Sequence, residues 1–152
     1  MKSSVTAIAT SKGSPSTLTA DCGPASSVSK PDELNLIKKG ANYGWPDVEG
    51  SGRMQGMTNP KVVWRTRDAS PSGLAFWQGD LWMAGLRGER LWQIPLDGTT
   101  TGDPIAHFRG DYGRLRTVEV AIDGNSLLLT NSNTDGRGDP ASDDDRLFRI
   151  TR

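Results

Sequence analysis

Arg114 and Arg116 are the residues of this sequence whose type and spacing most directly suggest chemistry. On a β-strand, residues two apart point to the same face, so the two guanidinium groups would stand side by side. Like charges at that separation are destabilising unless an anion lies between them. The pair therefore predicts either an anionic ligand, whose carboxylates arginine binds in two-point fashion, or an exposed strand face paired to Asp111 or Glu119.

Three other groups of polar residues have less specific patterns. Arg87 follows a strand-like run at residues 80–86 and is expected in a turn. The acidic residues Asp139, Asp143, Asp144 and Asp145 lack the spacing of a defined calcium loop, so a solvated charge run is the simpler interpretation. The only histidine, His107, lies in a short run at residues 105–108 and is expected to be an ordinary strand-edge histidine.

Composition limits the classes of protein to which the chain can belong. Its 152 residues carry a formal net charge of zero, and no basic run offers a surface for nucleic acid or an acidic membrane. No stretch approaches the length of a membrane span, and residues 1–20 lack the apolar segment of a signal peptide. A hydrophobic content of 34% with 18 glycines and 9 prolines favours many short strands joined by tight turns.

The elements that must position these side chains can be read along the chain. Residues 1–31 are rich in Ser, Thr and Ala and are predicted to be a disordered segment, whereas residues 32–46 are predicted to form an ordered loop. Turn dipeptides at 78–79, 97–98 and 123–124 predict antiparallel hairpins. Runs with strand character recur at residues 61–64, 73–77, 80–86, 90–96, 105–108, 116–122, 126–131 and 146–151.

A weak internal repeat organises these strands. Residues 79–81 match 124–127, and residues 90–94 match 146–150 when an insertion at residues 135–145 is allowed for in the second copy, which gives a period near 45 residues. The pattern predicts an all-β fold, a partial β-propeller with about two to three four-stranded antiparallel blades. Because so few blades cannot close a ring, the chain is a fragment of a longer protein, or assembles with other chains through open blade edges, or is a different sandwich of meanders.

The order of five motifs resembles the glucose/sorbosone dehydrogenase family. They are DELNLI at 32–37, NYGWP at 42–46, SPSGLAF at 70–76, LRGERL at 86–91 and GRLRTV at 113–118. The resemblance covers residues 32–152 and implies the C-terminal blades of a soluble six-bladed propeller. It also implies an enzyme that oxidises a sugar hydroxyl by hydride transfer to pyrroloquinoline quinone (PQQ), with calcium as a second cofactor.

The same resemblance assigns roles to particular residues. Arg87, Arg114 and Arg116 would bind PQQ, which carries three carboxylates and an ortho-quinone. Trp64 would lie against the flat cofactor, although packing in the core between blades is an equal alternative for so large a ring. The backbone carbonyls of Gly23 and Pro24 would approach calcium.

The resemblance leaves the catalytic cycle of this chain incomplete. The general-base histidine of the family comes from an early blade that this sequence lacks, so the isolated chain is expected to be inactive. A sugar substrate, a separate electron acceptor and a periplasmic or extracellular location are implied. A propeller-derived binding module without redox activity and a sugar-lactonase-like propeller are the alternatives.

Overall fold

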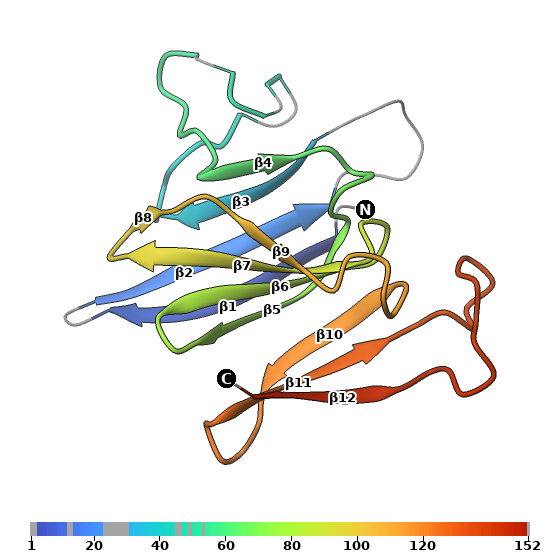
Figure 1. Cartoon of the computed structure of the whole chain (residues 1–152). Helices are drawn as coiled ribbons and strands as arrows, with labels where there is room; N and C mark the ends of the chain where they lie inside the picture. The colour runs from blue at the N-terminus through green and yellow to red at the C-terminus, as the bar shows by residue number, and fades with distance from the viewer. Residues whose placement is uncertain are drawn as a thin grey trace.

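Antiparallel strands in three sheets make up the fold (Figure 1). The structure is a computed structural model that describes residues 3–11, 14–22, 31–44, 47–48, 50–52 and 54–151. The first sheet contains β1 (Ser3–Ser11), β2 (Ser14–Cys22), β3 (Asp32–Ile37) and β4 (Val62–Trp64). The second contains β5 (Pro71–Trp77), β6 (Asp80–Gly85), β7 (Arg90–Asp97), β8 (Thr100–Thr101) and β9 (Ile105–His107). The third contains β10 (Leu115–Val120), β11 (Ser126–Asn131) and β12 (Leu147–Thr151).

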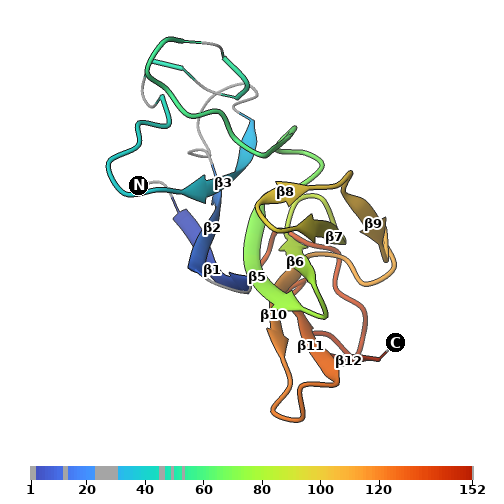
Figure 2. The same ribbon diagram turned by 90° about the vertical axis from the view of Figure 1, so that its left-hand side faces the viewer.

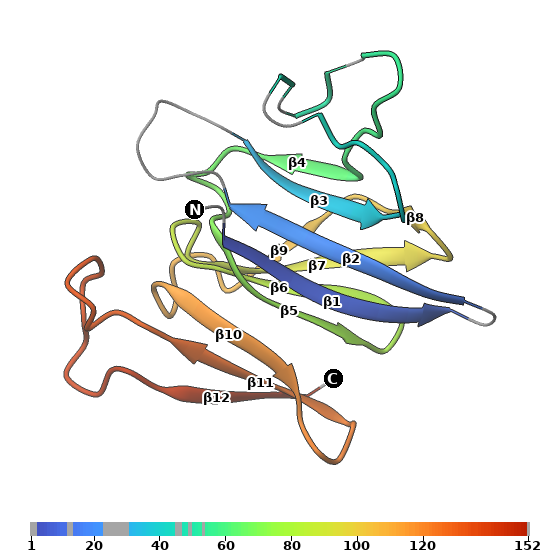
Figure 3. The same cartoon turned by 180° about the vertical axis from the view of Figure 1, so that it is seen from behind.

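The three sheets stand as consecutive blades. Seen in Figure 2, they fan out from β1, β5 and β10, and β5 contacts both of the other two strands. Figure 3 shows the same neighbourhood of β1 and β5 from behind. This arrangement confirms the predicted partial propeller, although the third sheet has three strands among the described residues. Across all the residues that the structure describes, no helix has the length and apolar character needed to span a membrane.

The hairpin turns follow from residues that tolerate a left-handed backbone. Gln78 and Gly79 join β5 to β6 with φ of 51° and 89°, the combination expected for a tight two-residue hairpin. Gly98 and Gly124 have φ of 60° and 69° in the turns after β7 and β10. The three predicted hairpins are therefore present.

Burial on both faces makes the second sheet the centre of the molecule. One face packs its side chains on the first sheet, and the opposite face packs on the third. Along β6 the two faces alternate, since Leu81 and Met83 belong to one core and Trp82 and Ala84 to the other. This two-sided burial explains the nearly continuous apolar run of that strand.

The N-terminal third differs from the sequence prediction. Residues 1–31 were predicted to be disordered, but β1 and β2 lie there and pair with each other, and β2 pairs with β3. Residues 32–37 form strand β3 instead of the predicted loop. Ser- and Thr-rich segments supply few apolar residues, so their β-propensity depends on a neighbouring strand edge that a local pattern does not reveal. Gly23 and Pro24 lie outside the described residues.

Candidate functional site

One end of the three sheets gathers four loops, and we call this end the mouth. It lies on the right of Figure 1. Backbone hydrogen bonds join the loops, for example from Leu86 N to Ser70 O (3.0 Å) and from Gly110 N to Glu89 O (2.8 Å). The loops that form the mouth are residues 65–70, 86–89, 108–114 and 132–146.

Buried polar groups hold the mouth together between the first and second sheets. Asp32 is fully buried at the start of β3, and its carboxylate accepts a hydrogen bond from Ser70 N (2.8 Å). A Cβ on Gly88 would lie 2.2 Å from the carbonyl oxygen of Asp68, so the loop of residues 86–89 approaches that backbone more closely than any side chain would permit.

Arg87 is exposed in the turn between β6 and β7. It makes no ion pair with any residue that the structure describes, whereas its neighbour Arg90 donates to Gly88 O (2.6 Å) and lies 3.8 Å from Asp68. The sequence correctly predicted that Arg87 follows the strand, and its guanidinium group is free at the mouth.

Arg114 and Arg116 do not form the predicted pair on one strand face. Arg114 precedes β10 and is 8% exposed; its Nη2 lies 3.3 Å from an Asp135 carboxylate oxygen, and its buried Nε has no hydrogen-bond partner. Arg116 is exposed where the register of β10 shifts between Leu115 and Thr117. The bulge breaks the two-residue alternation on which the prediction depended.

Trp64 lies in the core between the first and second sheets. It is 7% exposed, and its ring centroid is 5.9 Å from that of Trp92. Sequence analysis left open both core packing and a place against a cofactor, and the geometry of the described residues corresponds to core packing.

The β11–β12 loop is the feature that sequence analysis missed. Its acidic residues were predicted to be a solvated run, but the Asp144 side chain is 1% exposed. Hydrogen bonds from Asn133, Ala141 and Asn131 hold the pKa of the Asp144 carboxyl well below its usual range. Asn131 and Asn133, at the start of the same loop, were the signal available in the sequence, because a buried carboxylate requires hydrogen-bond donors such as their amide groups.

His107 lies on the edge strand β9, the position that the sequence predicted. On β9, its Nε2 lies 2.8 Å from Gln93 Oε1, and its ring packs 5.5 Å from that of Trp82. Burial lowers the pKa of His107, so the imidazole is held neutral by its surroundings.

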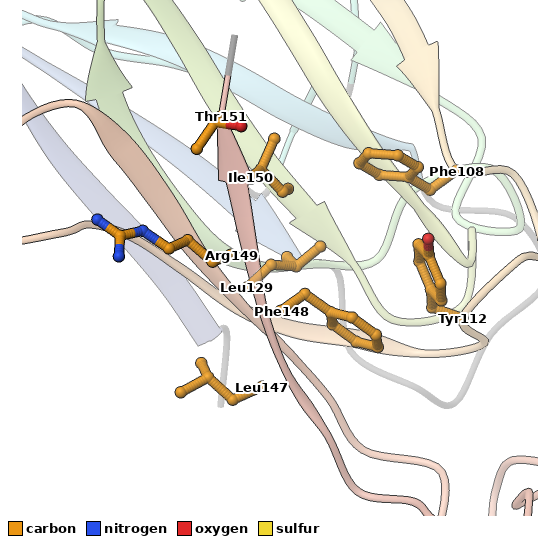
Figure 4. Close-up of a pocket in the computed structure, with 8 residues that line it drawn as sticks. All are labelled: Phe108, Tyr112, Leu129, Leu147, Phe148, Arg149, Ile150 and Thr151. Atoms are coloured by element: carbon orange, nitrogen blue, oxygen red, sulfur yellow. The ribbon is translucent and has the colours of Figure 1, made fainter.

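A groove of about 550 Å³ lies along β12 (Figure 4). Its aromatic side comes from Phe108, Tyr112 and Phe148, whose neighbouring ring centroids are 5.4 and 4.4 Å apart. None of the predicted site residues lines this groove. The full lining is Phe108, Tyr112, Leu129, Leu147, Phe148, Arg149, Ile150 and Thr151.

The described residues contain no group of three or more His, Cys, Asp or Glu side chains arranged to hold a metal ion. The predicted calcium contacts, Gly23 and Pro24, are backbone carbonyls outside that part of the chain.

Comparison with known proteins places these features in a family. A profile described as glucose/sorbosone dehydrogenase matches residues 4–139. The PQQ-bound form of an aldose sugar dehydrogenase from Streptomyces coelicolor is 50% identical, with a TM-score of 0.80 over 90% of this chain and 40% of that chain. A putative oxidoreductase (glucose dehydrogenase) from Thermus thermophilus is 36% identical, with a TM-score of 0.77 over 93% of this chain and 43% of that chain.

An uncharacterized protein from Synechocystis is 32% identical over an alignment of 123 residues, and the match covers 67% of this chain and 29% of that protein. The chain thus spans less than half the length of these relatives. The match from residue 4 also extends the family likeness into the segment before Asp32, where the sequence motifs had placed its start. With most of its length matched and its sheets arranged as propeller blades, the chain belongs to the glucose/sorbosone dehydrogenase family.

Proposed function

We propose that this chain forms the C-terminal blades of a PQQ-dependent sugar dehydrogenase, in which the mouth binds the cofactor. Family membership and the PQQ named for the Streptomyces relative support this assignment. The observation that carries it is a group of exposed arginines in and beside the mouth loops that form no ion pair among the described residues. Arg87 and Arg116, which the resemblance assigns to PQQ, belong to this group, as do Arg65, Arg109 and Arg137.

The charged groups at the mouth fit an anionic cofactor. PQQ carries three carboxylates, and arginine offers a planar fork that matches carboxylate geometry. Arg87 and Arg116 would supply this contact directly. Arg114 is paired with Asp135, and its buried Nε has no hydrogen-bond partner among the described residues; we propose that this buried ion pair supports the cofactor-binding surface from beneath.

The division of chemical roles follows from the residues present. When bound, PQQ supplies the quinone that accepts a hydride from the sugar. The part of this chain is to bind and orient carboxylates at the mouth. Because His107 is on the outer strand β9 with its Nε2 directed at Gln93, we propose that the general base comes from outside residues 1–152.

The remaining assignments rest on the family resemblance. We propose calcium as the second cofactor, approached by the carbonyls of Gly23 and Pro24, and a small sugar as substrate. A separate electron acceptor and a periplasmic or extracellular location complete the proposal.

Titration of the purified chain with PQQ in the presence of calcium tests the assignment. Quinone absorption and tryptophan fluorescence should report binding with a dissociation constant below about 100 µM, which corresponds to about 5.5 kcal/mol. Arg116→Ala should weaken binding, whereas Arg149→Ala, on the third sheet away from the mouth, should not. Absence of binding, or equal losses in both variants, would contradict the proposal.

A further inference from the structure

Two buried asparagines connect the β11–β12 loop to the segment that leads into β10. Asn131 is 4% exposed and Asn133 is 3% exposed. Their Nδ2 groups both donate to the carbonyl oxygen of Tyr112, at 3.0 and 3.1 Å. Asn133 Oδ1 accepts a hydrogen bond from Arg114 N (2.8 Å). The backbone immediately before Arg116 is therefore held by side chains from the end of another strand.

Asp144 is the centre of this network. Its carboxylate accepts hydrogen bonds from Asn131 Nδ2 (2.7 Å), Asn133 Nδ2 (2.8 Å) and Arg146 Nε (3.1 Å). An ionised carboxylate only accepts hydrogen bonds, so it requires the NH₂ side of each asparagine amide. The orientation of Asn133 is thereby fixed, with its oxygen directed at Arg114 N.

The network packs closely against the backbone at Gly113 and Gly138, where a side chain would clash. Gly113 has φ of +68°, and a Cβ there would lie 2.4 Å from Asn133 Oδ1. A Cβ on Gly138 would lie 2.8 Å from Arg114 Cδ, so the β11–β12 loop also covers the stem of that side chain. These close approaches lie three and two residues before Arg116, at Gly113 and Arg114.

We propose that Asp144 is a positioning residue, which acts through Asn131 and Asn133 to hold Arg116 in place for an anionic ligand at the mouth. This inference rests on the proposed function, because it takes the anionic ligand at the mouth to be PQQ. It assigns a defined task to an acidic loop whose sequence indicates only a charged surface.

Asp144→Asn and Asp143→Asn form a matched pair of variants. The two variants each remove one negative charge, at neighbouring positions of the same loop. By charge alone, each should slightly increase the affinity for a ligand with three negative charges. Asp143 is exposed, with only a 3.5 Å contact to Arg146. If Asp144 positions Arg116, Asp144→Asn should weaken PQQ binding instead, by roughly tenfold or more, the size usual for losing an outer hydrogen-bond partner of a site. Asp143→Asn should stay within about twofold.

Amide hydrogen exchange supplies a second readout that needs no cofactor. At a temperature where all variants are folded, exchange at Arg114 N should rise at least about tenfold in Asp144→Asn and stay near wild type in Asp143→Asn. Unchanged exchange in Asp144→Asn would overturn the positioning role whether or not PQQ binds. Faster exchange with unchanged PQQ affinity would overturn it too, since the network would then serve stability alone. If the wild-type chain binds no PQQ, the proposed function fails and the exchange comparison still decides whether Asp144 holds this segment.

Discussion

Replacing Gly113 with alanine should destabilise the fold far more than the same change at Gly110. Both glycines have a left-handed backbone, with φ of +68° and +77°. A Cβ at Gly110 meets nothing within 4 Å, whereas at Gly113 it would lie 2.4 to 2.8 Å from the amide atoms of Asn133. Comparing Gly113→Ala with Gly110→Ala therefore separates the cost of backbone strain from the cost of the steric clash with Asn133.

The expected magnitudes follow from these contacts. Placing a non-glycine residue in the left-handed region costs about 1 to 2 kcal/mol, and this is the whole expected effect of Gly110→Ala. Gly113→Ala must also displace Asn133, whose side chain makes hydrogen bonds with Arg114 N, Tyr112 O and Asp144. At about 0.5 to 1.5 kcal/mol each, their loss adds about 2 to 4 kcal/mol.

Urea denaturation followed by tryptophan fluorescence measures both losses, and the slopes should stay equal if the unfolded states are alike. A cycle with Asn133→Ala sharpens the test, because in that background Gly113→Ala should cost only the strain of about 1 to 2 kcal/mol. Equal losses for the two glycines, or an unchanged Gly113 loss after Asn133→Ala, would refute the argument that the buried amide occupies this space.

Three other outcomes are expected. Burial lowers the pKa of His107, so the stability that depends on its neutral form is present above about pH 6.5 and lost as the pH falls through the lowered folded-state pKa. His107→Gln should therefore flatten the dependence of the unfolding free energy on pH between about pH 5 and 7. An unchanged pH dependence in this variant would contradict the argument. Arg149→Ala removes a hydrogen bond to Ser126 and an ion pair with Asp123 at a site away from the mouth, so PQQ affinity should stay within about twofold. Arg116→Ala should lose roughly ten- to a hundredfold in the same titration. The open edge of β12 should make the chain self-associate at micromolar concentration, and a single monomeric species in sedimentation velocity would refute this.

The central and C-terminal strands could be predicted because their signals are local. The turn at Gln78 and Gly79 needs only residues that accept positive φ, and the period of two along each strand reports which faces are buried. The repeat that matched residues 90–94 with 146–150 correctly aligned β7 with β12, the third strands of their blades. In contrast, turn residues follow β3 directly, among them Gly40 with φ of 76°, and they favoured a loop over the whole segment. The strand character of β3 depends on pairing with β2 and β4.

The arrangement of the mouth could not be predicted from spacing, because it depends on residues distant in sequence. Asp135, 21 residues after Arg114, pairs with the guanidinium group of Arg114. The bulge between Leu115 and Thr117 shifts the register of the strand at Arg116. Nothing within the motif itself indicates either event. The asparagines and Asp144 likewise acquire their roles only when the β11–β12 loop folds back onto the start of β10.

The distribution of compensated charges gives a more specific expectation for the ligand site than the arginine spacing does. Arg90 and Arg114 are shielded at the mouth, since each has a carboxylate within 4 Å and little exposed side-chain surface. Arg87 and Arg116 are exposed, and no described carboxylate pairs with them. Without a ligand, an exposed guanidinium group is well solvated by water. A flat anion that covers Arg87 and Arg116 would exclude this water, and each arginine–carboxylate contact would then be stronger. Arg65, Arg109 and Arg137 in the mouth loops are likewise exposed without an ion pair among the described residues, so exposure alone does not select the site. We expect the binding surface at Arg87 and Arg116 because the family resemblance assigns these two residues to PQQ, with the buried pair of Arg114 and Asp135 as its support.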